Sequence, residues 1–468
     1  MTPLGYILLP VGIVGLFVSK KWLYRLFVFW TLFSATSAAN FGDDENGSGL
    51  QVWMLFGFLW LLRLLLDHLS ILSFAIDRRI LRPCFWLVGF LAIASFSLIM
   101  PVYINGRLAI SSPILGDFSE TPLYLTSHNF TQLLYLIFGG IIAICVAHSN
   151  LRDEDRQQTE KVILLSAIFI SVWGLFQFFC NATGFPYPDY IFNNSGSATA
   201  KGFMQTLDIG VGRISSVTVE PSEFAKSLIT LLPLTFPAWL KKGSIISRPI
   251  DRLVTVLFIL LLVLSTSSTA YFGLLALAIV TVLLLLRTGD LSLKRAFNYS
   301  LLAVVATSAV IAAALTSIPI VSGIASTAVL DKSSSGSGLE RVMTIQLAFE
   351  YFQKYPFLGI GWGSAGSHDL IVKLLSNVGI IGTVAFFGAM GCVVRANWRA
   401  LEKLILPVNI SRWVWLLALI VFLIISAATE FPLVFGNFWL ILGMAIATSS
   451  KSIRSHLQSP APQPIPIE

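Results

Sequence analysis

Residues 253–286 read LVTVLFILLLVLSTSSTAYFGLLALAIVTVLLLL and contain no Asp, Glu, Lys or Arg. An α-helix needs roughly 20 mostly apolar residues to cross the hydrocarbon core of a bilayer. The stretch is long enough for two such helices, and Ser and Thr interrupt it near its middle. We therefore expect two consecutive membrane-spanning helices, at about 252–266 and 269–287.

The whole chain has the same apolar character. Of its 468 residues, 56% are hydrophobic and only 12% are charged, and the mean hydropathy is +0.80. A soluble domain carries about 25% charged residues, so a chain this poor in charge could not cover a water-exposed surface. The composition excludes an ordinary soluble protein and predicts an all-α, polytopic helical membrane protein. The four cysteines are scattered in or beside apolar runs, which fits neither a disulfide framework nor a metal site.

Apolar runs of sufficient length predict about thirteen transmembrane helices. They lie at about 3–19, 22–40, 50–70, 84–104, 129–148, 160–180, 222–240, 252–266, 269–287, 297–318, 370–394, 412–428 and 431–449. We expect residues 1–450 to form a single transmembrane domain and the Pro-rich residues 451–468 to form a disordered cytoplasmic tail.

Lysine and arginine residues indicate the orientation of these helices. Most of the 31 fall in the loops after the odd-numbered segments, as Lys20 and Lys21 do after the first. Loops rich in Lys and Arg stay in the cytoplasm, which places the N-terminus outside and the C-terminus inside. The net charge of +7 is then a topology signal, and because it is spread over separate loops we expect no nucleic-acid binding. Within the third span, Arg63 and Asp67 are four residues apart and are expected to pair on one helix face.

Two long outer loops are expected at about 181–221 and 319–369. Loops of this length in a compact protein are usually functional or disordered. In the second loop, residues 339–352 predict an amphipathic helix lying on the outer surface. One face of this helix would carry Leu339, Val342, Gln346, Phe349 and Phe352.

The end of the first loop carries two carboxylates. It reads RISSVTVEPSEFA from Arg213 to Ala225. Pro221 suits the first position of a helix, so Glu220 would stand at or just before the start of a span, with Glu223 in its first turn. One interpretation is that these carboxylates complement the helix dipole. The other is that a carboxylate at the membrane surface, near an arginine, belongs to a reaction site.

Further motifs follow in the second half of the chain. They are LER at 339–341, YPFLGIG at 355–361 and NVGIIG at 377–382. Together with RISSVTVEPSEFA, in this order and with this spacing, they resemble the O-antigen polymerase and ligase superfamily of bacterial envelope enzymes. The Glu-Pro-Ser at 220–222 is similar to the motif of the polymerases.

This resemblance implies a substrate, a reaction and a location. The substrate would be oligosaccharide repeat units carried on undecaprenyl pyrophosphate, polymerised at the outer leaflet of the bacterial inner (plasma) membrane for O-antigen, capsule or exopolysaccharide. A chain-length regulator and a flippase of the same pathway would be partners. No cofactor or metal is implied, and the outer face offers no His, Cys and carboxylate cluster at metal-ligand spacing.

The same resemblance assigns roles to cationic residues. Negative charge builds on the leaving pyrophosphate, and the planar fork of an arginine matches phosphate oxygens. Arg213 and Arg341 stand in the family motifs and are therefore expected to act in catalysis and to bind pyrophosphate. Lys226 and Lys373, early in their spans, are further candidates for pyrophosphate binding. Alternatively, both lysines extend to the outer headgroups without a role in the reaction.

Two residues could take the proton of the acceptor hydroxyl, Glu220 and His368. His368 resembles a histidine that precedes a conserved helix in ligase-like members, where Asn usually follows; here Asp369 follows. Alternatively, His368 is a surface or capping residue. Glu220 stands in the motif most similar to the polymerases and is favoured.

Two other functions remain open from the sequence. Within the superfamily, a ligase would transfer finished glycan to lipid A core or protein. From another class, a flippase or transporter of lipid-linked sugars would show internal repeats and buried charges near the midplane. The halves show no obvious repeat, and the unusual residues gather at one surface, which favours an enzyme.

Overall fold

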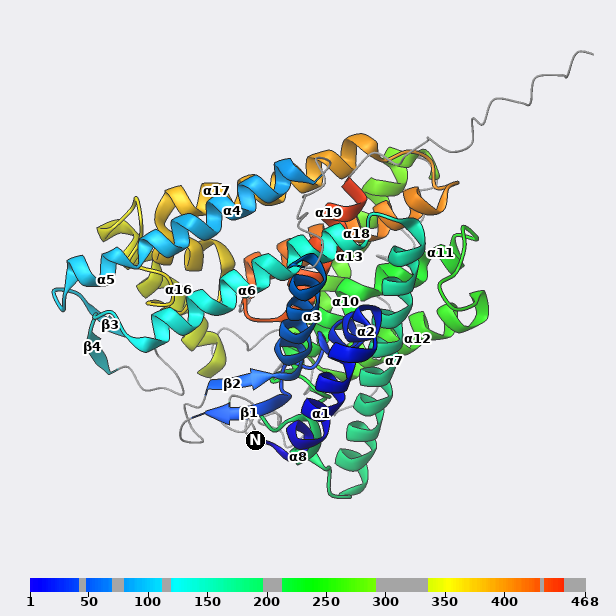
Figure 1. Ribbon diagram of the computed structural model, residues 1–468, viewed down its shortest axis with the longest axis horizontal. Helices are drawn as coiled ribbons and strands as arrows, with labels where there is room; N and C mark the ends of the chain where they lie inside the picture. The colour runs from blue at the N-terminus through cyan, green and yellow to red at the C-terminus, as the bar shows by residue number, and fades with distance from the viewer. Residues whose placement is uncertain are drawn as a thin grey trace, which may run out of the picture.

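The computed structural model describes residues 1–41, 48–69, 80–111, 119–196, 213–291, 336–429 and 433–449. The described chain is mainly helical, with two short antiparallel hairpins (Figure 1). Six of its helices are long and apolar enough to cross a membrane: Leu81–Ile104, Ser127–Ser149, Asp153–Thr183, Ser268–Thr288, Leu370–Ala400 and Pro407–Ala428. The all-α, membrane-type architecture is thereby confirmed. The span expected at 297–318 and the tail at 451–468 lie outside the described residues.

Helices cover most of the predicted apolar segments. With the six just named, they are α1 (Pro3–Val18), α2 (Lys20–Trp30), α3 (Val52–Leu69), α4 (Leu81–Ser97), α5 (Ile99–Ile104), α6 (Ser127–Ser149), α7 (Asp153–Thr183), α10 (Pro221–Leu231), α11 (Phe236–Trp239), α12 (Arg248–Leu264), α13 (Ser268–Thr288), α17 (Leu370–Ala400), α18 (Pro407–Ala428) and α19 (Gly436–Ser449). The expected outer loops contain α8 (Asp189–Phe192) and α16 (Gly336–Lys354). The hairpins pair β1 (Ser37–Phe41) with β2 (Ser48–Gln51) and β3 (Ala109–Ser111) with β4 (Glu120–Pro122).

The prediction of one helix at 22–40 is wrong. Helix α2 ends at Trp30, and the chain continues as a buried turn into β1. Hydropathy alone misses this end because Ala scores as apolar, whereas the interspersed Ser and Thr residues bond to backbone outside a helix. The Thr36 hydroxyl, for example, donates to the carbonyl of Phe192 in α8 at 2.6 Å. The segment therefore packs beside α8, in the first of the two loops expected to be outer, and does not continue as a membrane span.

Helix α17 is broken near its first third. Gly379 has φ 62° and ψ −169°, outside the helical region. The turn at residues 355–363 docks into this break, and the N–H of Ile360 donates to the carbonyl of Ser376 at 2.8 Å. The backbones approach so closely that a Cβ on Gly359 would lie 2.4 Å from that carbonyl oxygen. Gly359 of the YPFLGIG motif and Gly379 of the NVGIIG motif thus let the turn pack closely against α17. This contact fixes the position of α16, which precedes the turn in the sequence.

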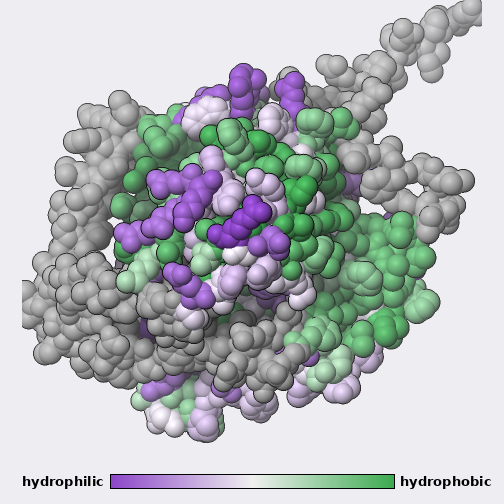
Figure 2. All heavy atoms as spheres, turned by 90° about the vertical axis from the view of Figure 1, so that its left-hand side faces the viewer, coloured by the Kyte–Doolittle hydropathy of each residue, from purple (hydrophilic) through white to green (hydrophobic). Residues whose placement is uncertain are grey.

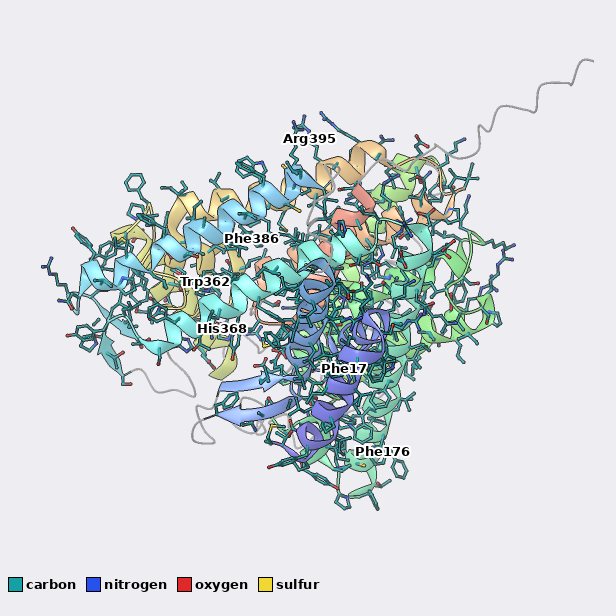
Figure 3. The ribbon with its side chains drawn as sticks, viewed as in Figure 1. Phe17, Phe176, Trp362, His368, Phe386 and Arg395 are labelled. Atoms are coloured by element: carbon teal, nitrogen blue, oxygen red, sulfur yellow. The ribbon has the colours of Figure 1, made fainter. Side chains whose placement is uncertain are left out.

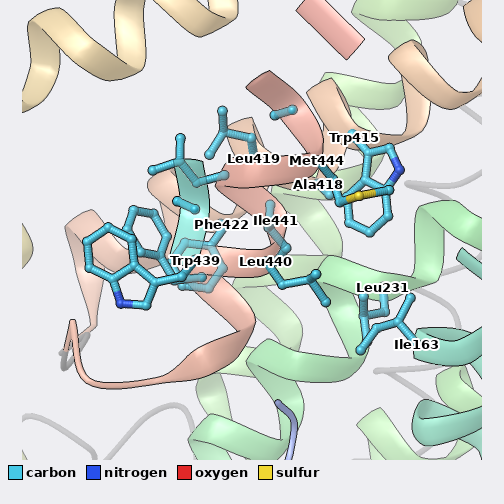
Figure 4. Close-up of a cluster of buried hydrophobic side chains, with 14 of the residues drawn as sticks. Ile163, Leu231, Trp415, Ala418, Leu419, Phe422, Trp439, Leu440, Ile441 and Met444 are labelled. Atoms are coloured by element: carbon cyan, nitrogen blue, oxygen red, sulfur yellow. The ribbon is translucent and has the colours of Figure 1, made fainter. Parts of the chain in front are cut away.

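The core of the molecule lies around α18 and α19. Nearly every residue of α19 is buried, and it packs on α6, α17 and α18. Trp415, Phe422, Trp439 and Met444 fill the space between these helices (Figure 4). A helix that is apolar all round is buried in the core, so α19 serves as scaffold for the helices around it.

The two ends of the helices differ in character. His368 and Arg395 lie at opposite ends of α17 (Figure 3). Away from His368, ion pairs gather near the helix ends. Lys20–Asp67, Lys21–Asp155 and Lys242–Asp290 join different segments, whereas Arg63–Asp67 and Arg156–Asp153 each lie within one helix. The expected pair of Arg63 and Asp67 is confirmed, at 3.1 Å. The other end carries α5, the β3–β4 hairpin and α16, where hydrophilic side chains gather in the middle of the face (Figure 2).

Candidate functional site at one end of the helices

The loop from Arg213 to Glu220 is buried between its two charged ends. Its residues 214–218 are fully buried. Gln177 of α7 fixes its middle, because the Gln177 side-chain oxygen accepts hydrogen bonds from the N–H groups of Ser215 at 2.9 Å and Ser216 at 2.7 Å. The loop is thus a rigid connection that presents Arg213 and Glu220 at its ends.

Ser216 adopts a left-handed backbone conformation, with φ 53°. Such a conformation costs a residue other than glycine about 1–2 kcal/mol and persists only where the surroundings hold it. Here the Ser216 hydroxyl also donates to the carbonyl of Ile170 at 2.6 Å. Tyr187 donates to the carbonyl of Ser216 at 3.1 Å. Strain held by several partners is typical of a loop whose geometry serves a site.

The two carboxylates after this loop have different surroundings. Glu220 is the N-cap residue of α10, with Pro221 at the first helical position as expected, and it accepts from the Ser222 hydroxyl at 3.0 Å. Glu223 accepts from the Ser34 hydroxyl at 2.9 Å and from the N–H of Val219 at 3.3 Å. Glu223 therefore ties the buried turn after α2 to the start of α10, which is a structural role.

Helix α16 confirms the expected helix over 339–352, but it packs on a different face. Thr344, Ala348 and Tyr351 are buried, whereas Val342 and Phe349 are exposed. The sequence pattern did not identify the packed face because Thr344 is polar and Ala348 is small beside the large apolar residues Leu339, Val342, Phe349 and Phe352. Tyr351 anchors the helix by accepting from the N–H of Ser111 in β3 at 2.9 Å. The exposed Val342 and Phe349 leave an apolar strip beside the charged residues.

Arg213 and Arg341 come together although they are far apart in the sequence. Burial lowers the pKa of Arg213; Glu220 acts in the opposite direction and Arg341 adds to the lowering. All three groups therefore lie within electrostatic range of one another. Arginine stays charged in proteins, so two guanidinium groups and one carboxylate act on one another here. A guanidinium group partly removed from water, such as that of Arg213, would attract an anion.

His368 is joined to the same turn of α16. The Thr344 hydroxyl lies 2.9 Å from His368 Nδ1, and it donates to the carbonyl of Arg341 at 2.9 Å. The next residue, Asp369, caps α17 by accepting from the N–H of Val372 at 2.8 Å. The capping role proposed for this position thus falls to Asp369, and His368 points its ring toward α16.

The two lysines occupy separate places. Lys226 is only 4% exposed and lines a narrow cavity with Ser34, Glu223 and Asn437. Lys373, in the first turn of α17, is half-buried and lies within electrostatic range of His128.

Sequence reasoning missed Gln177 and Thr344. Gln177 stands in the apolar run 160–180, where an uncharged amide gives a weak signal among Phe residues. Thr344 gives no signal, because a single Thr on a surface helix is ordinary.

Within the described ranges, no group of three His, Cys, Asp or Glu side chains could hold a metal ion. No protein-family model and no curated protein matches the chain.

Proposed function

We propose that the chain is a membrane glycosyltransferase that polymerises oligosaccharide repeat units linked to undecaprenyl pyrophosphate. The observation that supports the proposal is that Glu220 and Arg341 both act electrostatically on Arg213; these residues belong to the two motifs resembling the superfamily. The motifs lie more than a hundred residues apart in the sequence, yet their charged residues lie within electrostatic range of one another.

The proposed reaction accounts for these residue types. An acceptor hydroxyl oxygen bonds to the anomeric carbon of the donor glycan, and the bond from that carbon to the pyrophosphate oxygen breaks. Arg213 and Arg341 stabilise the negative charge that the leaving pyrophosphate gains, since both are in place before the reaction. The hydroxyl proton passes to Glu220 or to His368. The released undecaprenyl pyrophosphate leaves through the surrounding lipid.

The membrane arrangement follows from the same proposal. The long apolar helices cross the bilayer, with the N-terminus and the end bearing His368 outside and the C-terminus in the cytoplasm. Figure 3 places His368 at the end of α17 opposite Arg395, which stands near the C-terminal end of that helix. The exposed apolar side chains Val342 and Phe349 of α16 would lie at the level of the lipid surface, where the prenyl chain emerges.

A ligase is the second candidate. The link from His368 through Thr344 to the Arg341 carbonyl favours it, because a histidine in this position resembles the ligase-like members. Both reactions use the same donor and the same leaving group, so the arginines serve either one. They differ in the acceptor, which is another lipid-linked unit for a polymerase and lipid A core or protein for a ligase.

Incubation of the purified full chain in a bilayer with a lipid-linked repeat unit separates these functions. A polymerase gives a ladder of products on a gel, whereas a ligase gives one discrete product and only when its acceptor is added. Covalently unchanged substrate that has crossed the bilayer indicates a flippase. Absence of any glycosidic product, in the presence of either acceptor, would overturn the enzymatic proposal.

A further inference from the structure

We infer that Thr344 is a positioning residue that fixes the neutral tautomer of His368, so that Nε2 rather than Nδ1 takes the proton of the acceptor hydroxyl. This inference rests on the proposed function for its chemical consequence. Its structural part, the tautomer, stands on the hydrogen bonds alone.

The Thr344 hydroxyl has a single proton and two neighbours within hydrogen-bond distance. That hydroxyl donates to the carbonyl of Arg341, one turn earlier in α16, at 2.9 Å. A hydroxyl has one hydrogen to donate and lone pairs with which to accept. Its contact with His368 Nδ1, also 2.9 Å, is then one in which Nδ1–H donates and Thr344 accepts.

The consequence concerns the opposite nitrogen of the ring. A neutral imidazole has one N–H and one lone pair, so a proton held on Nδ1 places the lone pair on Nε2. The partner of one ring nitrogen commonly decides the state of the other. Thr344 plays the part here that a buried carboxylate plays in a catalytic triad, but without adding negative charge.

The neighbouring carboxylate is already engaged. Asp369 follows His368 directly and would be the obvious partner for Nδ1, but its side chain accepts from the N–H of Val372 at 2.8 Å. The hydroxyl of Thr344, 6% exposed, provides an uncharged acceptor instead. A neutral acceptor leaves the local charge positive, which suits a site that also binds a pyrophosphate.

The tautomer is measurable by ¹⁵N nuclear magnetic resonance. The full chain is labelled at histidine nitrogen and reconstituted in bilayers; with five histidines, the His368 signals are assigned by their loss in His368→Asn. At a pH where the ring is neutral, we expect a protonated Nδ1 and an unprotonated Nε2 in the wild type. Protonation of Nε2 in the wild type would overturn the inference without any variant.

Two substitutions of Thr344 test whether this residue fixes the tautomer of His368. Thr344→Val keeps the shape and removes the acceptor, and we expect the His368 signals to move toward the Nε2–H tautomer. Thr344→Ser keeps the hydroxyl and is expected to retain the wild-type spectrum. An unchanged tautomer in a folded Thr344→Val protein would overturn the role of Thr344.

Kinetics test the catalytic consequence separately. General acid–base catalysis contributes roughly 10²–10⁴-fold, so Thr344→Val is expected to lower kcat by at least about tenfold with little change in KM for the lipid-linked donor. Thr344→Ser should restore most of the rate. If the tautomer shifts and the rate does not, His368 is not the base; if no chain makes product, only the proposed function fails.

Discussion

The side-chain oxygen of Gln177 accepts a hydrogen bond from the N–H of Ser216 at 2.7 Å, and Ser216 has a left-handed backbone. The same oxygen accepts from the N–H of Ser215. A residue of α7 therefore holds the strained loop whose ends carry Arg213 and Glu220. Because α7 reaches across the molecule, this loop is as rigid as the helix that holds it.

Gln177→Leu is expected to reduce activity strongly. The substitution leaves two buried N–H groups without their acceptor, at a cost of about 1–3 kcal/mol each, and the loop would leave its strained conformation. We expect at least a tenfold loss of kcat/KM in the polymerisation assay. Gln177→Glu keeps the accepting oxygens and should retain more activity, and Gln157→Leu, at an exposed position of the same helix, should be neutral. Equal rates in wild type and Gln177→Leu would contradict the role of this contact.

Arg213→Ala and Arg341→Ala are each expected to abolish polymer while the protein remains in the membrane. Removal of either guanidinium leaves one cation against Glu220, so stabilisation of the leaving pyrophosphate is largely lost. Arg213→Lys and Arg341→Lys should be partly active, because an ammonium keeps the charge but not the planar fork. Since the two groups act together, the loss of transition-state stabilisation in the double variant should be smaller than the sum of the losses in the two single variants.

Ladder formation on gels and membrane fractionation measure these effects. Arg107→Ala is the matched control, because Arg107 is an exposed arginine in the connection to β3. It should leave the ladder unchanged. Polymer of wild-type length from both Arg213→Ala and Arg341→Ala would sink the proposed site.

Much of the fold follows from hydropathy, but its breaks do not. Apolar length predicted helices over most of the segments where the structure has them, and the two motifs identified Arg213 and Arg341, which lie within electrostatic range of one another. The end of α2 at Trp30 was not predicted because Ala scores as apolar in the segment that follows. The break at Gly379 was not predicted because an isolated Gly is tolerated in a helix. The break is needed only because a turn that is distant in the sequence packs against it.

The positioning residue Thr344 was not predicted from the sequence for a related reason. The sequence reveals residues that are unusual for a membrane span, such as Lys226, and residues that belong to a motif. Thr344 is neither, and its importance comes from contacts between segments that the sequence does not place. Long-range hydrogen bonds of this kind can be found only when the fold is known.

Glu220→Gln and Glu223→Gln are expected to differ in kind. Glu223 accepts from the Ser34 hydroxyl and the N–H of Val219, so its substitution weakens a charge-assisted contact worth about 1.5–3 kcal/mol and should lower the melting temperature. Glu220 faces Arg213, so Glu220→Gln should lose more activity at a nearly unchanged melting temperature. Thermal unfolding and initial rates on the same preparations check both. If Glu223→Gln loses more activity than Glu220→Gln, Glu220 is not the base.

Gly379→Ala tests whether the turn at 355–363 must dock into α17. A Cβ on Gly379 would lie 2.2 Å from the carbonyl atoms of Phe357, and the φ of 62° is unfavourable for any residue with a Cβ. Backbone on both sides has to move, so we expect destabilisation of several kcal/mol, or failure of the folded protein to accumulate. Gly391→Ala is the control on the same helix, since a Cβ there meets nothing within 4 Å and alanine favours helix. Because the docked turn connects α16 to α17, Gly379→Ala should also separate Arg341 from Arg213 and remove activity at temperatures where the protein is still folded. A Gly379→Ala protein as stable and active as Gly391→Ala would show that the break in α17 is dispensable for assembling the site.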